Sequence, residues 1–174
     1  TDPETGDTRL GRFGWKSSEA SLRHQVAAAL NTDMGVLTTV RPAPDCGPQQ
    51  PGCDTAAPEL ADEHLRDLTD YISLLSVNAR KDVDDAQALA GEALFAAAAC
   101  NACHVESLPT SPFHPKAELR SQTIQPYTDL LLHDMGPGLA STLTEGDVSP
   151  SEWRTAPLWN IGHTAEVSGG EAYL

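Results

Sequence analysis

The pentapeptide Cys-Asn-Ala-Cys-His at residues 100–104 combines residue types and a spacing that can carry specific chemistry. Two thiols separated by two residues can hold zinc, act as a dithiol redox pair, or form thioethers with the two vinyl groups of a haem. A histidine directly after the second cysteine is placed to ligate the iron of a haem attached in this way. We therefore predict a c-type haem bound covalently to Cys100 and Cys103, with His104 as a ligand of its iron.

Zinc and dithiol chemistry are the alternatives at this motif. A structural zinc site needs two further Cys or His ligands at short spacing, and the remaining cysteines, Cys46 and Cys53, fall in a separate stretch of the chain. A thioredoxin-like dithiol sits in a strand-helix unit, and no strand pattern precedes Cys100. The context therefore favours haem over both alternatives.

A haem iron held by His104 has a second axial position, for which Met135 is the first candidate. A Gly-Pro-Gly turn follows Met135 directly, and a thioether ligand stabilises ferrous iron. The alternatives are His133, His163 and an open position. Met34, the other methionine of the chain, lies in the same tripeptide, Asp-Met-Gly, and could serve a second haem in this way, with packing in a core as its alternative.

The charge and hydropathy of the chain exclude two classes of partner. Its 174 residues include 11 basic and 25 acidic side chains, for a formal net charge of -14 at pH 7. A surface of this charge repels polyanions, so we expect no nucleic-acid partner, whereas a small basic redox protein would be attracted. The longest apolar stretch, Ala-Leu-Phe-Ala-Ala-Ala-Ala-Cys, is far shorter than the roughly 20 residues that cross a bilayer, so we expect no membrane span.

Aromatic residues make up only 5% of the chain, and its apolar residues recur mainly at helical spacing. This pattern predicts an all-α fold, with helices joined by long irregular loops. The expected helices span residues 18–31, 58–76, 85–99 and, as a short one, 126–133. Capping and first-turn preferences suggest where they begin: Ser17 or Ser18 for the first helix, Pro58 for the second, and Asp82 or Asp84 for the third.

The stretch of residues 38–57 carries four prolines and both Cys46 and Cys53, so we expect a loop there. A disulfide between these cysteines would close about eight residues and stabilise the fold by about 2.5 kcal/mol. Two unpaired thiols are the alternative. Because disulfides persist in oxidising compartments, the bond would indicate an exported chain.

Four blocks of the sequence resemble one family. They are LGRFGWKSSEASLRHQVAAALNTDMGVLTT, CNACHVESLPT, IQPYTDLLLHDMGPGLA and EWRTAPLWNIG, and together they are similar to the bacterial di-haem oxidoreductases, some described as thiol oxidoreductases, which are relatives of di-haem cytochrome c peroxidases. The resemblance implies cytochrome c-like haem domains, a periplasmic location and two haems. One haem c would be bound by this chain, and the second by a missing part or a partner chain.

The resemblance also suggests a domain organisation. Residues 1–80 would form the closing part of a first cytochrome c-like domain, with the loop disulfide and with 58–76 as its terminal helix. Residues 81–174 would form a second domain that carries the attachment motif. Family members are longer, with an earlier Cys-x-x-Cys-His and a closing helix, so we expect a complementary polypeptide or partner chain to complete both domains.

Further residues are candidates for contacts with the haem. The helix before the motif resembles the first helix of cytochrome c domains, in which a glycine allows close contact with the final helix and an aromatic ring packs beside the haem. Gly91 and Phe95 would take these roles. Haem propionates find Arg, Trp or Tyr donors, and the candidates are Arg154 and Trp159, followed by Arg120 and Tyr127, with carboxylate pairing as the alternative for the arginines.

The motif and the resemblance together favour one function, an electron-transfer haem domain within a periplasmic di-haem oxidoreductase. The alternative is a peroxidase or thiol oxidase in which the haem on His104 is the catalytic centre. A six-coordinate iron cannot bind peroxide without losing a ligand, so the second axial position separates the two functions.

Overall fold

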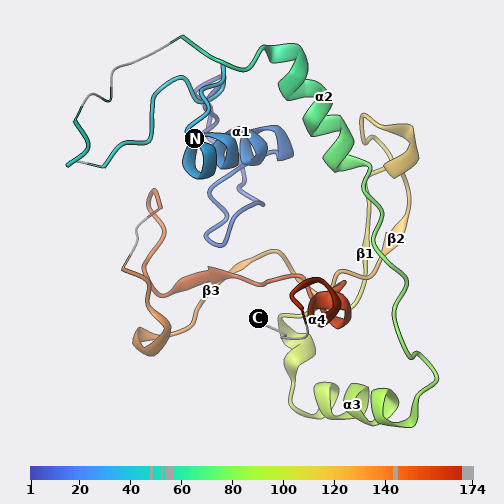
Figure 1. The fold of residues 1–174 in the computed structure, drawn as a ribbon. Coiled ribbons are helices and arrows are strands. Elements are labelled where there is room, and N and C mark those ends of the chain that lie inside the picture. The colour runs from blue at the N-terminus through green and yellow to red at the C-terminus, as the bar shows by residue number, and fades with distance from the viewer. Residues whose placement is uncertain (48, 52, 54–56, 143–144, 170–174) are drawn as a thin grey trace. The chain divides into compact units, whose positions relative to one another are not determined.

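The computed structural model describes residues 1–47, 49–51, 53, 57–142 and 145–169 (Figure 1). The chain forms two compact units. The first comprises Thr1–Leu75 and Met135–Glu152, and the second comprises Ser76–Asp134 and Trp153–Leu174. The first unit therefore includes a late segment of the chain. The assignment of residues 1–80 and 81–174 to two cytochrome c-like domains stays a prediction.

The residues that the structure describes contain four α-helices and two small antiparallel sheets, so the predicted all-α fold is wrong. The helices are α1 (Leu22–Met34), α2 (Asp62–Ser73), α3 (Ala86–Ala97) and α4 (Thr164–Val167). The strands are β1 (Leu108–Pro109), β2 (Thr123–Ile124), β3 (Leu132–Asp134) and β4 (Glu152–Arg154). β1 pairs with β2, and β3 pairs with β4. The fold is mixed, with helices, short strands and long loops.

The strands are too short for sequence periodicity to reveal. β1 and β2 contain two residues each, and β3 and β4 contain three. Alternation of apolar and polar residues becomes a usable signal only over about four to eight residues. Pro109 can belong to β1 because each strand of a two-stranded sheet has one unpaired side.

The core of the first unit lies between α1 and α2. Its buried side chains are Val26, Ala27, Val40 and Leu65, against which partly buried residues pack: Leu22, Leu30, Leu60, Leu68 and Ile72. The main-chain N–H groups of Glu59 and Leu60 donate to the oxygen of Leu37. This pairing holds the two residues outside the helix, so α2 begins at Asp62 and not at Pro58.

The first helix also begins later than predicted. Ser17 has a left-handed φ of 53°, and Glu19 forms a β-bridge with Phe13, so neither belongs to a helix. Ser21 is the N-cap of α1, and its hydroxyl accepts a hydrogen bond from a main-chain N–H in the first turn. Gly35 ends the helix in the left-handed conformation, with a φ of 69°.

In the second unit, α3 leads into the attachment motif. Its N-cap is Asp85, and not the predicted Asp82 or Asp84, because the Asp85 side chain accepts hydrogen bonds from the N–H groups of Gln87 and Ala88. None of its side chains is buried, and Leu89 and Leu94 are 52% and 70% exposed. Within the described ranges, no helix is both long enough and apolar enough to cross a membrane.

Residues 126–133 do not form the predicted helix. Tyr127 and Leu130 have left-handed φ values of 51° and 59°, which a helix cannot accommodate. The side chains of Thr128 and Asp129 each accept a hydrogen bond from the main-chain N–H two residues later. Such local bonds compete with helical ones, and they give the chain the extended path that continues into β3.

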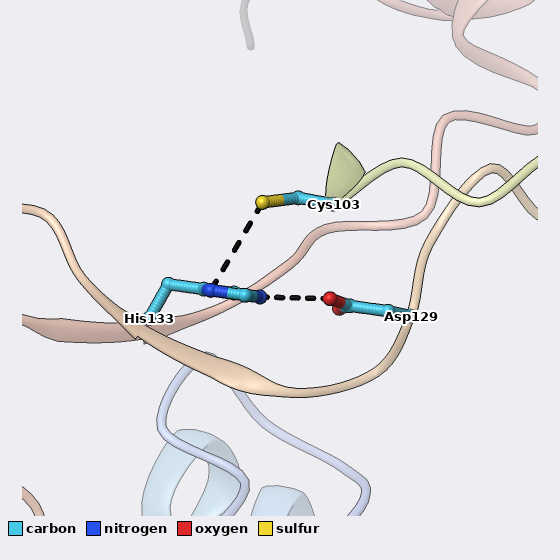
Figure 2. Close-up of side chains that lie close together, drawn as sticks. All are labelled: Cys103, Asp129 and His133. Carbon is cyan, nitrogen blue, oxygen red and sulfur yellow. Dashed lines mark hydrogen bonds and ion pairs between the residues drawn. The ribbon is translucent and has the colours of Figure 1, made fainter. Parts of the chain in front are cut away.

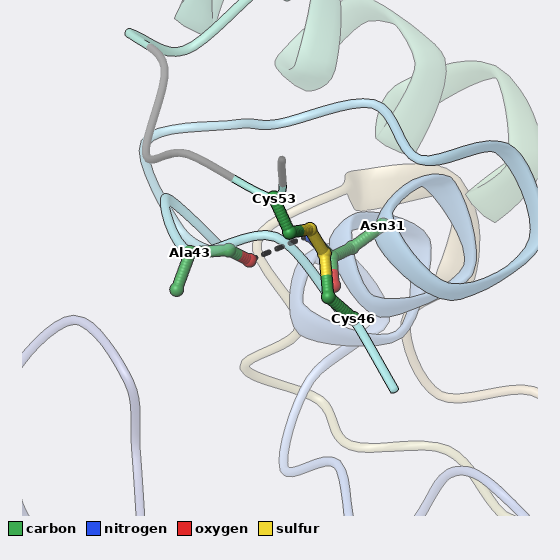
Figure 3. Close-up of a disulfide and its surroundings, with 4 residues drawn as sticks. All are labelled: Asn31, Ala43, Cys46 and Cys53. Atoms are coloured by element: carbon green, nitrogen blue, oxygen red, sulfur yellow. Dashed lines mark hydrogen bonds between the residues drawn. A yellow bond between two sulfur atoms is a disulfide. The ribbon is translucent and has the colours of Figure 1, made fainter. Parts of the chain in front are cut away.

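The predicted disulfide between Cys46 and Cys53 is confirmed (Figure 3). The Cα atoms of the two cysteines are 6.3 Å apart. Nearby, the side-chain amide of Asn31, on α1, donates a 2.9 Å hydrogen bond to the main-chain oxygen of Ala43. The described part of this proline-rich loop is thus fixed by a covalent bond and by a contact with α1.

Candidate haem attachment site

The Cys-x-x-Cys-His motif forms a tight turn directly after α3. Ala99 adopts a left-handed φ of 59°, and Cys100–Ala102 forms a short 3₁₀ helix. The N–H of His104 donates to the oxygen of Cys100 at 3.0 Å, which closes the turn. The thiols of Cys100 and Cys103 are free and half-buried, so both are available for reaction.

The imidazole of His104 is oriented by one hydrogen bond. Its Nδ1 lies 2.8 Å from the main-chain oxygen of Tyr127. Because a carbonyl oxygen can only accept, Nδ1 carries the hydrogen, and Nε2 of the neutral ring keeps its lone pair. Metal-binding histidines are held in this manner, with one ring nitrogen donating to a protein oxygen and the other facing the metal. The donor set of the motif therefore fits a haem iron ligated by His104.

The main chain that accepts this hydrogen bond is itself firmly held. Thr128 is fully buried, its N–H donates to the oxygen of Val105, and its hydroxyl donates to the oxygen of Thr155 at 2.6 Å. The N–H of Leu158 donates to the oxygen of Pro126 at 2.9 Å. These bonds fix the acceptor on both sides, so the orientation of His104 is built into the fold.

The aromatic ring of Phe95 contacts His104. The ring centroid of Phe95, on α3, is 6.1 Å from that of His104 and 6.2 Å from that of Tyr127, with edge-to-face geometry in both pairs. Burial raises the pKa of Tyr127, and Arg80 opposes that increase. Phe95 therefore lies beside the motif histidine, although its contact with a haem stays a prediction.

A cavity of about 580 Å³ lies next to these rings, and such a volume is typical of small-ligand sites. Phe95, Tyr127, Trp159, Gly91 and His163 are among the residues that line it, whereas Cys100, Cys103 and His104 are not. The structure thus brings Phe95 and Trp159 to one cavity.

The other predicted site residues have varied surroundings. Arg154 is half-buried in β4, and its burial lowers its pKa. Met135 belongs to the first unit, is 52% exposed, and donates its N–H to the oxygen of Ser151. Met34, at the end of α1, is 69% exposed and does not fill a core. The roles of Arg154, Trp159 and Met135 toward a haem stay predictions.

One group of side chains was not predicted from the sequence. Cys103, Asp129 and His133 lie together in the second unit (Figure 2). Burial raises the pKa of Asp129, but the N–H of Leu131, the Thr155 side chain and His133 lower it more, so that it lies below its usual value. The sequence gives His133 as an alternative iron ligand, and no local signal places it near Cys103, which lies 30 positions earlier.

Comparisons with known proteins address the family of the chain. The family model described as "Di-haem oxidoreductase, putative peroxidase" matches residues 2–174. No curated protein and no solved structure matches the chain. The family match covers nearly the entire chain and confirms the resemblance that the four sequence blocks indicate. Together with the geometry around His104, it shows a redox protein of a haem-containing class: the chain belongs to the di-haem oxidoreductase family.

Proposed function

We propose that this chain binds a c-type haem covalently through Cys100 and Cys103, with His104 as an iron ligand, and relays electrons within a periplasmic di-haem oxidoreductase. The observation that carries the proposal is the Nδ1 hydrogen bond from His104 to Tyr127, which leaves Nε2 for the iron. The family match supports a redox role and a haem. The disulfide between Cys46 and Cys53 supports an oxidising, and hence exported, location.

Met135 is the proposed second axial ligand. Both ring nitrogens of His133 have partners, since Nε2 lies 2.8 Å from Asp129 and Nδ1 lies 4.0 Å from the sulfur of Cys103. His163 has Nδ1 3.1 Å from Glu166, and its buried Nε2 has no hydrogen-bond partner among the described residues, so His163 stays the alternative ligand. The thioether of Met135, in contrast, is on a largely exposed side chain. When bound, the haem would supply one-electron chemistry at its iron, and a methionine ligand would favour the ferrous state.

Exposed apolar side chains support a partner polypeptide, and the di-haem family match supports a second haem. On α3, Leu89 and Leu94 face solvent, and at the end of α2, Tyr71 and Leu75 are 67% and 56% exposed. Large apolar side chains that face solvent are available for contact with another polypeptide. We propose that a complementary polypeptide or partner chain completes both haem domains. The acidic charge of -14 would also attract a small basic redox protein as electron donor.

A second candidate function is peroxide reduction or thiol oxidation at this same haem. The description of the matching family, which includes the word peroxidase, supports peroxide reduction as the alternative. The two functions differ in the visible spectrum. A low-spin ferric haem with the weak red band of a methionine-iron bond supports the relay, whereas a high-spin haem that changes its spectrum on addition of peroxide supports catalysis.

A pyridine haemochrome assay combined with intact-mass measurement tests the proposal directly. The purified chain, expressed with a c-type maturation system, should show one haem that resists acid extraction and adds its mass to the polypeptide. A variant with both Cys100→Ser and Cys103→Ser is the matched control and should carry none. A colourless wild-type chain with only the mass of its amino acids would contradict the proposal.

A further inference from the structure

The side chains of Cys103, His133 and Asp129 form a chain of contacts in the second unit (Figure 2). The sulfur of Cys103, at the end of the attachment turn, lies 4.0 Å from Nδ1 of His133, on β3. Nε2 of the same ring lies 2.8 Å from an oxygen of Asp129, in the loop before β3. A haem-attachment cysteine is therefore linked to a carboxylate through an imidazole.

The hydrogens of this chain can be placed from its chemistry. A carboxylate only accepts hydrogen bonds, so Nε2 of His133 carries the hydrogen and donates to Asp129. In the neutral ring, Nδ1 then has a lone pair, and it faces the Cys103 sulfur. The thiol hydrogen of Cys103 can thus point toward Nδ1 of His133, which lies 4.0 Å from the sulfur, the outer limit for a hydrogen bond to sulfur.

The other attachment cysteine has different surroundings. Within the part of the chain that the structure describes, Cys100 has a free, half-buried thiol with no side-chain hydrogen-bond partner. The two thiols of one motif are therefore unequal: the Cys103 thiol is held and the Cys100 thiol is not. This difference predicts that Cys100 and Cys103 form their thioether bonds at different rates when His133 or Asp129 is replaced.

We propose that His133, oriented by Asp129, holds the Cys103 thiol in place for its thioether bond, so that attachment through this cysteine depends on the pair. The inference rests on the proposed covalent binding of haem. In this step the S–H group of Cys103 adds across the C=C bond of a haem vinyl group. The sulfur bonds to the carbon nearer the porphyrin, and the π bond of the vinyl group is lost. The hydrogen of the broken S–H bond is transferred to the outer carbon, where it forms a C–H bond. No electron is gained or lost, so no oxidant takes part.

The test follows each cysteine separately in the 174-residue chain. The chain is purified without haem, reduced, and mixed with ferrous protohaem in the absence of oxygen. Samples are quenched over time, the remaining thiols are alkylated, and peptide mass mapping scores Cys100 and Cys103. The haemochrome band position reports independently whether one or two vinyl groups have reacted, and Cys103→Ala provides the reference spectrum for one.

In the wild-type chain we expect both cysteines to react. In His133→Ala and Asp129→Ala, Cys103 should react about tenfold more slowly while Cys100 keeps its rate, since only the placement of the Cys103 thiol is lost. His133→Gln, whose amide oxygen can accept the thiol hydrogen, should regain part of the rate. His64→Ala, which removes an exposed histidine of α2 without contact to Cys103, should behave as wild type.

Two results would overturn the inference while leaving the proposed function intact. One is an unchanged Cys103 rate in both alanine variants, and the other is an equal loss at Cys100 and Cys103, which indicates general unfolding. A wild-type chain that forms no thioether at either cysteine would instead overturn the proposed function, and this inference with it.

Discussion

His104 and Tyr127 are joined by a 2.8 Å hydrogen bond from the imidazole Nδ1 to the main-chain oxygen. His133 is held in the opposite way, because its Nε2 donates to Asp129 and its Nδ1 faces Cys103. The two histidines therefore present different ring nitrogens, and only His104 has its Nε2 left for a metal by these contacts. This difference distinguishes the proposed iron ligand from its neighbour.

Replacement of His104 by alanine should remove the ligand on which the site depends. We expect the amount of stably bound haem to fall about tenfold or more. The haem that remains attached should lose its low-spin spectrum. Absorption spectra and haem-to-protein ratios measure both effects. His64→Ala, which removes an exposed histidine of α2, is the control and should retain its haem. Equal losses in the two variants would speak against a specific role of His104.

Replacement of Met135 tests the second axial position. Met135→Ala should abolish the weak red methionine-iron band and lower the reduction potential, because a thioether stabilises ferrous iron. Met34→Ala is the matched control, as it removes the other methionine of the chain, and should leave this haem unchanged. An identical spectrum and potential in Met135→Ala would point to a histidine ligand or an open position.

The part of the haem site that the sequence predicts is the part formed by neighbouring residues. The motif residues are adjacent, so their chemistry can be predicted from spacing alone. The contact between Cys103 and His133 joins residues 30 positions apart and depends on the extended path into β3, which periodicity does not predict. The predicted helix over residues 126–133 does not form, because the side chains of Thr128 and Asp129 accept hydrogen bonds from main-chain N–H groups two residues later.

The helices show the same division between local and tertiary causes. α3 is an alanine-rich segment with a good N-cap, so its existence follows from composition and its start was misplaced only by the choice among three nearby aspartates. The start of α2 could not be predicted, because the hydrogen bonds of Glu59 and Leu60 to Leu37 come from elsewhere in the unit. Tertiary hydrogen bonds thus set boundaries that capping preferences alone miss.

Removal of the Cys46–Cys53 disulfide should destabilise the first unit. The double variant Cys46→Ser, Cys53→Ser should lower the free energy of unfolding by about 2.5 kcal/mol, since the unfolded loop is no longer constrained. Urea unfolding of the oxidised wild type and the variant measures the difference. Wild type treated with reductant should have the same free energy of unfolding as the variant. If reductant also lowered the stability of the variant, thiols other than Cys46 and Cys53 would cause the loss.

Lys16 should be a major contributor to the stability of the first unit. Its side chain is only 2% exposed, and its ammonium group donates to the main-chain oxygens of Pro150 and Glu152 at 2.7 Å and of Ser149 at 3.3 Å. Lys16→Met would leave these oxygens without their charged donor. We expect the free energy of unfolding to fall by about 2–3 kcal/mol.

The control for Lys16 is a lysine at the surface. Lys81 forms an ion pair with Glu166, but its side chain is 37% exposed, so Lys81→Met should cost less than about 1 kcal/mol. Urea unfolding of both variants makes the comparison. A loss at Lys16 no larger than that at Lys81 would mean that the buried ammonium contributes little to holding residues 149–152.

Asp2 should make the stability of the first unit depend on acid pH. A hydrogen bond from Arg9 is the main cause that lowers the pKa of Asp2 from 3.8 to about 2, with help from the main-chain N–H groups of Glu4 and Thr5 and from nearby His24. Because the pKa is lower in the folded state, the carboxylate stabilises the fold fully above its unfolded pKa. That contribution is lost as the pH falls from near 4 toward 2.

The substitution Asp2→Asn removes the titrating group and tests this sign. At neutral pH the variant should be less stable than wild type, and the difference should shrink as the pH falls through the window between 3.8 and about 2, because protonated Asp2 no longer attracts Arg9. Urea unfolding at several pH values measures the difference. Asp33→Asn, at an exposed position, should run parallel to wild type. A constant gap between Asp2→Asn and wild type across this window would show that Asp2 acts through packing and not through its charge.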